Sequence, residues 1–172
     1  MHADSSASEG SQTEPVSTGD EPPEPFHLQT PAGFVPADQK WLSDHLEQLQ
    51  GHLPREVEQI NIRLLDDTGM SQLHQQWKGL EGPTDVLSWF HSSGDQPLEA
   101  DLAVGHEVAA REAALRGHPV RQEILLYIVH GILHGCGFDD LVPEAAARMH
   151  AEEDRILALL GVEATYTREA SE

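Results

Sequence analysis

Two histidines one helical turn apart are the residues of this chain best placed to do chemistry. They are His130 and His134, in the run HGILHGCGFDD at residues 130–140. Because an α-helix has about 3.6 residues per turn, side chains four positions apart project from one face. That places two ring nitrogens at the separation that one tetrahedral or octahedral divalent ion requires. The spacing therefore predicts a mononuclear metal site.

The residues after the second histidine are expected to supply a third ligand. Gly135 and Gly137 tolerate backbone conformations that end a helix, so the chain should turn back there. The turn would bring Asp139 or Asp140 toward the two rings. We predict that His130, His134 and Asp140 hold one divalent ion, with Zn²⁺ preferred and Asp139 as the alternative third ligand.

The segment that must position the histidines is the most apolar in the chain. VRQEILLYIV, residues 120–129, is apolar almost all round and predicts a buried helix. A histidine pair on such a helix can also be a hydrogen-bonded core pair. The acids beyond the glycines favour a metal, because they supply the partner that two buried rings need. Cys136 lies off the shared helical face, and Glu153, on the inward face of the last helix, could hold a ligand histidine from behind.

Periodicity and capping signals predict an α+β fold, with a four-stranded mixed sheet packed against about five helices. The metal site lies at the end of the central buried helix. The expected strands are Phe26–Thr30, Ile60–Leu64, Val86–Phe90 and Leu102–Val104. The expected helices run from an Asp38 cap to Leu49, from Asp66 or Asp67 to Trp77, His106–Arg116, Val120–His134 and Pro143–Leu160.

Length and composition fit one domain, at residues 26–161 of 172. Residues 1–25 are rich in Ser, Glu, Pro and Gly, have no Lys or Arg, and predict a disordered acidic tail; residues 162–172 are expected to be a C-terminal tail. No stretch suggests a signal peptide or a membrane span. The single cysteine cannot form an internal disulfide, which agrees with a reducing compartment, so we expect a cytoplasmic protein.

Several ordered blocks resemble one known family, the bacterial YbeY-type endoribonucleases that act in ribosomal RNA maturation. The family's metal motif reads roughly HGxLHLxGYDH, and the residues that match it are His130, Gly131, Leu133, His134, Gly137 and Asp139. GPTDVLSWF at 82–90 resembles the family's PTDVLSF strand, and residues 100–113 resemble its GDIVIS strand and following helix. The closing helix is matched by Met149, Glu153, Ile156 and Leu157, so the resemblance covers residues 26–161.

The resemblance implies a metal-dependent, single-strand-directed endoribonuclease that processes the 3′ end of 16S rRNA and acts in ribosome quality control. Precursor rRNA and ribosomal small-subunit proteins are the implied partners, without DNA or membrane. The sequence departs from the family at two positions. Asp140 stands where the third ligand is usually a histidine, which makes the metal's identity less specific. Lys78 stands where an arginine commonly assists catalysis; it keeps the charge without the two-pronged geometry, or is an ordinary solvated lysine.

The net charge of −20 fits a ribonuclease least well, because phosphate neutralisation supplies much of the affinity for nucleic acids. The first 25 residues hold six of the acids, which leaves −14. If RNA binds, it must use a local basic cluster, the metal ion itself or a ribosomal protein partner. The available cations are Arg55, Arg63, Lys78, Arg111, Arg116 and Arg121. Two rival functions remain: a non-catalytic ribosome-associated factor with a structural metal, and a zinc peptidase, for which Gly131 replaces the HExxH glutamate.

Overall fold

Two stretches of alternating apolar residues form the centre of a four-stranded sheet. In the computed structural model, which describes residues 23–163, β2 (Val57–Leu65) pairs in parallel with β4 (Leu98–Gly105). The short β1 (Phe26–Gln29) pairs in parallel with β2, and β3 (Val86–Phe90) pairs antiparallel with β4 at the opposite edge. The order is β1-β2-β4-β3, which confirms the predicted mixed sheet.

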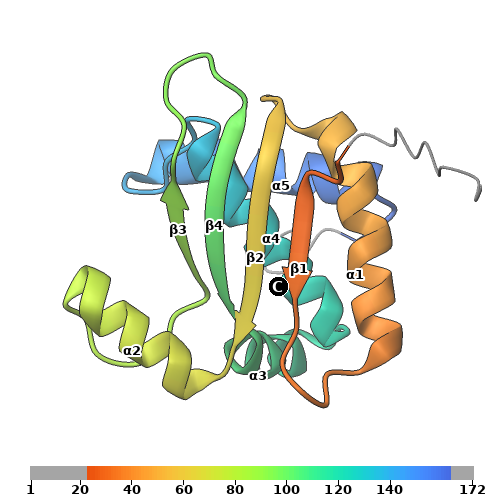
Figure 1. Cartoon of the computed structure of the whole chain (residues 1–172), viewed down its shortest axis with the longest axis vertical. Coiled ribbons are helices and arrows are strands. Elements are labelled where there is room, and N and C mark those ends of the chain that lie inside the picture. The colour runs from red at the N-terminus through yellow and green to blue at the C-terminus, as the bar shows by residue number, and fades with distance from the viewer. Residues whose placement is uncertain (1–22, 164–172) are drawn as a thin grey trace, which may run out of the picture.

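Five α-helices surround the sheet, as predicted. They are α1 (Pro36–Leu49), α2 (Asp67–Lys78), α3 (His106–Arg116), α4 (Val120–Gly135) and α5 (Pro143–Leu159), with a short 3₁₀ turn η1 at Gln50–His52. In Figure 1, α4 and α5 lie behind the sheet, α1 runs along its β1 side, and α2 sits at the foot of β3.

The main core lies between the sheet and the helices behind it. Side chains two apart on a strand share a face, and Ile60, Ile62 and Leu64 of β2 are all buried while Asn61 and Arg63 are exposed. Leu42, Leu46 and Leu49 of α1 join the same core, as do Met149, Ile156 and Leu157 of α5. Helix α4 crosses this core and is buried almost throughout from Glu123 to Leu133.

The element boundaries differ from the prediction at three places. Strands β2 and β4 run longer than expected, because both are central strands whose backbone groups pair on two sides, so polar residues at their ends stay in the ladder. Asp38 does not cap α1; Val35 is the N-cap and Pro36 takes the first helical position, for which its fixed φ is suited. Asp66 caps α2 as predicted, accepting from the Gly69 amide at 2.8 Å.

The described residues bear only partly on the predicted tails. Residues 1–22 and 164–172 lie outside the described range, and so does most of each tail. Val162, assigned to the C-terminal tail, is 4% exposed and packs into the main core, and its amide donates to the Leu157 carbonyl at 2.9 Å. No helix within residues 23–163 is long and apolar enough to cross a membrane.

Candidate metal centre

The last two turns of α4 lie against β3 and β4 because glycine faces the sheet there. A Cβ on Gly131 would stand 2.9 Å from the Ser88 hydroxyl, and one on Gly135 would stand 2.5 Å from the Phe90 ring. Both glycines have helical backbone conformation, so their role is to let the helix approach the sheet closely. Gly135 was expected to help end the helix; Gly137 instead takes the left-handed conformation, with φ of 93°. The helix therefore holds His130 and His134 near the sheet edge.

The turn after α4 brings one carboxylate to the two histidine rings. The Nε2 atoms of His130 and His134 lie 3.2 Å apart, and the Asp140 carboxylate lies 3.5 Å from the first and 3.8 Å from the second. One ligand atom from each of the three residues falls within 4.8 Å of the others. The group predicted from the sequence is thus brought together from a helix and the loop that follows it.

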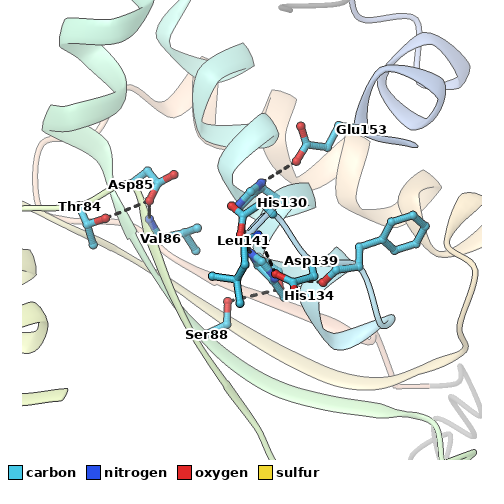
Figure 2. A network of polar contacts seen from close by, with 12 residues as sticks. Thr84, Asp85, Val86, Ser88, His130, His134, Asp139, Leu141 and Glu153 are labelled. Atoms are coloured by element: carbon cyan, nitrogen blue, oxygen red, sulfur yellow. Dashed lines mark hydrogen bonds and ion pairs between the residues drawn. The ribbon is translucent and has the colours of Figure 1, made fainter. Parts of the chain in front are cut away.

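The other nitrogen of each ring is already engaged. His130 Nδ1 lies 2.6 Å from the Glu153 carboxylate of α5, and His134 Nδ1 lies 3.1 Å from the Phe138 carbonyl, as Figure 2 shows for the labelled side chains. Because both partners are acceptors, Nδ1 is the nitrogen that keeps a proton when either ring is neutral. In that form each Nε2 offers its lone pair to the group. Glu153 thus contacts His130, one of the two histidines that it was expected to be able to hold.

The donor set fits a small divalent cation. Two ligands held at about 2.0–2.1 Å from one ion at tetrahedral angles lie about 3.3–3.4 Å apart, close to the separations found here. Without a metal, a proton shared between the two Nε2 atoms would have to offset the repulsion between their lone pairs and the Asp140 carboxylate. Imidazole and carboxylate together suit Zn²⁺, and the carboxylate also suits harder ions.

The other candidate ligands lie outside the group. The Asp139 carboxylate accepts the Leu141 amide at 2.9 Å, and it is exposed. Cys136 caps the end of α4, half-buried, and burial raises the pKa of its thiol to about 11, which disfavours the thiolate that binds metals. These placements favour Asp140 over Asp139 as the third ligand.

Charge around His130 favours the protonated ring over the neutral one. Burial alone lowers the pKa of His130, but the hydrogen bond and charge of Glu153 outweigh it, with smaller contributions from Asp85 and Asp140, so the pKa is raised. A metal and a proton compete for the same Nε2 lone pair. The negative surroundings that stabilise one cation stabilise the other.

A hollow of about 410 Å³ opens beside the group. His130, His134 and Asp140 line it together with Lys78, Asp85 and residues of β3. Lys78 is exposed, ends α2 and precedes Gly79, which caps the helix in a left-handed conformation with φ of 66°. Ser88 lines the hollow, and its hydroxyl lies 3.3 Å from the Gly131 carbonyl.

The comparisons with known proteins agree with this geometry. The family model for Endoribonuclease YbeY matches residues 34–161. The chain belongs to the YbeY family. A YbeY endoribonuclease from Methylocella silvestris is 36% identical over 124 residues, covering 70% of this chain and 69% of the relative. One from Roseiflexus sp. is 34% identical over 127 residues, covering 68% of this chain and 76% of the relative.

A plant protein also matches the chain in sequence, and one solved structure matches it in fold. A chloroplastic YBEY endoribonuclease of Arabidopsis thaliana is 34% identical over 134 residues, covering 75% of this chain but 22% of that longer protein. The solution structure of TM1509 from Thermotoga maritima matches with a TM-score of 0.53 and 21% identity, over 78% of this chain and 90% of that one. That likeness shows that the two chains share a fold.

The structure adds two supporting residues whose roles the YbeY motifs do not reveal. His74 Nδ1 lies 2.9 Å from the Gly82 carbonyl, a contact that ties α2 to the loop after Lys78. Arg55, counted only as an available cation, donates to the Gly135 carbonyl at 2.8 Å and to Gln96 at 2.9 Å. It thereby fixes the end of α4. Neither contact has a local sequence signal, because each joins residues from separate elements.

The loop that enters β3 is held by hydrogen bonds among its own residues. The Asp85 carboxylate accepts the Val86 amide at 2.7 Å and the Thr84 hydroxyl at 3.0 Å (Figure 2). These bonds start the strand beside the hollow. Lys78 is therefore carried by a segment anchored at both ends, through His74 on one side and Asp85 on the other.

Proposed function

We propose that this chain is a metal-dependent endoribonuclease that cleaves single-stranded RNA. His130, His134 and Asp140 hold one divalent ion, with Zn²⁺ preferred. The observation that supports the proposal best is the convergence of two histidine Nε2 atoms and the Asp140 carboxylate. Glu153 and a backbone carbonyl hold the two histidine rings through their Nδ1 atoms. Three protein ligands leave a coordination position open, as in catalytic zinc sites.

The chain's own residues would prepare the phosphodiester for hydrolysis. A divalent ion in such a site acidifies water and polarises a phosphoryl oxygen. Glu153 fixes the orientation and tautomer of His130 through a buried hydrogen bond. Lys78, on the rim of the same hollow, offsets negative charge that develops on the phosphoryl oxygens, and we assign it the catalytic role that an arginine commonly has in the family.

The proposed substrate is precursor ribosomal RNA. The relatives named above are endoribonucleases, and by analogy this chain would act in the cytoplasm on the 3′ end of 16S rRNA and in ribosome quality control, in contact with the small subunit. A chain of net charge −20 gains little from general attraction to phosphate, so recognition must be local or assisted by ribosomal proteins.

The test is a cleavage assay on purified protein with a labelled single-stranded RNA and the same RNA annealed to its complement. We expect cleavage of the single strand, loss of cleavage with chelator and in His134→Ala, and reduced cleavage in Lys78→Ala. Lys40→Ala is the matched control, because Lys40 is an exposed lysine that pairs only with Asp44 on α1 among the contacts described. Chelator-induced melting with no cleavage would instead identify the non-catalytic factor, and casein cleavage the peptidase.

A further inference from the structure

The outer face of the sheet, opposite α4, carries an unusual row of side chains. Cross-strand partners point to the same face, and the pairing places His27, Asn61, Asp101 and Trp89 side by side. The next row holds Gln29, Arg63, Ala103 and Leu87. Figure 1 shows this face toward the viewer, and within residues 23–163 the only helix on it is α2, at the foot of β3.

A hollow of about 580 Å³ lies on this face beside α2, and the buried Ala103 is among the residues that line it. Two indole rings bound it: Trp89 from β3 and Trp77 from α2, with ring centroids 5.6 Å apart in an edge-to-face contact. Trp77 is 57% exposed, although an indole is costly to leave in water. The hollow is therefore an aromatic surface that remains without a cover in the described part of the chain.

The polar groups around the rings suit a nucleobase. Gln29 and Gln76 line the hollow with amides that offer both donors and acceptors, and Arg63 adds a planar guanidinium. Unpaired bases in RNA complexes stack on aromatic rings and on arginine planes, and such open sheet faces are known base platforms. The nearby Asp101 is already hydrogen-bonded, by Asn61 at 2.8 Å and by His91 at 2.7 Å. Its charge is thereby partly offset.

This surface continues into the candidate metal centre. Trp77 and Lys78 are neighbours at the end of α2, and one lines the outer hollow while the other lines the hollow beside the histidines. On β3, Trp89 belongs to the outer hollow and its neighbour Ser88 to the inner one. β3 is an edge strand, so a polymer can pass around it from one face to the other.

We propose that Trp77 and Trp89 form a stacking site for unpaired bases of an RNA strand whose scissile phosphate lies at the metal centre. This proposal rests on the proposed function and extends it by naming where the flanking nucleotides bind. Base stacking tolerates sequence variation and needs few phosphate contacts, which suits an acidic chain. It also favours single strands, because bases in a duplex are already stacked on one another.

The test measures RNA binding in chelator, where cleavage is blocked. A short fluorescein-labelled single-stranded RNA is titrated with full-length protein and its anisotropy is followed. We expect Trp77→Ala to weaken binding about 5- to 150-fold, the range typical of losing a base–aromatic stack. Trp77→Phe keeps a ring and should stay near wild type, whereas Trp77→Leu keeps only apolar area and should resemble Trp77→Ala.

The control is Leu115→Ala, because Leu115 is an apolar side chain 81% exposed on α3 and should leave affinity unchanged. Binding of the complementary duplex should be weaker than that of the single strand. Equal affinity of Trp77→Leu, Trp77→Phe and wild type would overturn the proposal. The proposal would also be overturned if Trp77→Ala lost binding to small ribosomal subunits but bound free RNA as wild type does, because the surface would then belong to a protein partner.

Failure of the stacking site and failure of the proposed function give different results. Binding that depends on Trp77, in a protein that never cleaves RNA, refutes the nuclease and keeps the surface. Chelator-sensitive cleavage with affinity independent of Trp77 refutes the surface and keeps the nuclease.

Discussion

Replacing Glu153 should weaken metal binding without removing a ligand. Its carboxylate is fully buried and lies 2.6 Å from His130 Nδ1, a short, charge-assisted hydrogen bond. In Glu153→Gln the amide oxygen still accepts, but the charge is lost. Hydrogen bonds to charged groups contribute about 1.5–3 kcal/mol and neutral ones about 0.5–1.5 kcal/mol. The difference, about 1–1.5 kcal/mol, corresponds to roughly five- to tenfold weaker binding.

Glu153→Ala removes the hydrogen-bond partner of His130 altogether and should weaken metal binding about 10- to 100-fold, the usual effect of replacing a residue that hydrogen-bonds a metal-binding histidine. The matched control is Glu152→Gln, because Glu152 is the neighbouring glutamate on α5 and bonds Arg155 rather than a histidine. The assay is Zn²⁺ competition against a chromophoric chelator. Affinity that stays at the control value in both Glu153 variants would refute the reasoning.

Three further predictions concern packing and charge. Gly131→Ala adds a methyl that meets side chains of β3 and β4 at 2.9–3.0 Å, so we expect a loss of about 1–3 kcal/mol in chemical denaturation; unchanged stability would show that α4 can move. Glu123→Ala removes a buried carboxylate that lies 3.0 Å from the Arg116 guanidinium and 2.9 Å from the His118 ring, and should cost about 3 kcal/mol in stability. Asp44→Ala removes one partner of an exposed pair and should cost far less, so similar losses in the two variants would contradict this prediction. The hydrogen bond from Arg111 lowers the pKa of Asp67, so this pair stabilises the fold above the ordinary aspartate pKa of about 4 and ceases to do so as pH falls through the lower folded value. Denaturation should therefore show Arg111→Ala less stable than wild type at neutral pH and equal to it in strong acid, and a gap independent of pH would contradict the assignment.

Local signals sufficed for most of the elements that position the centre. The apolar run before His130 gave α4, and the alternation at Ile60, Ile62 and Leu64 gave the middle of β2. The ends were harder to predict, because they depend on pairing and packing with distant residues. Asp38 is a good capping residue by type, yet Pro36 begins the helix two positions earlier.

The third ligand also depended on tertiary structure. Asp139 and Asp140 are equivalent by type, and only the path of the turn after Gly137 sends one to the rings and the other to the Leu141 amide. Glu153 was predictable because it falls on the inward face of its helix. The contact of Arg55 with the end of α4 was not, since 80 residues separate the partners.

The outer face of the sheet shows the same limit. Trp77 and Leu73 of α2 both line the hollow, but Trp77 remains largely exposed. Periodicity predicts which face of a helix is apolar and leaves open whether another element covers it. The hollow depends on how α2 packs beside the sheet, which no local pattern predicts.

Metal binding by matched aspartate variants tests the central claim most directly. Zn²⁺ titration followed by calorimetry would compare wild type with Asp140→Asn, Asp139→Asn and His134→Ala. We expect a single ion per chain in wild type and in Asp139→Asn, whose side-chain oxygen can still accept the Leu141 N–H. We expect much weaker metal binding in Asp140→Asn and none in His134→Ala. No binding by wild type, or equal losses in the two aspartate variants, would contradict a site built from His130, His134 and Asp140.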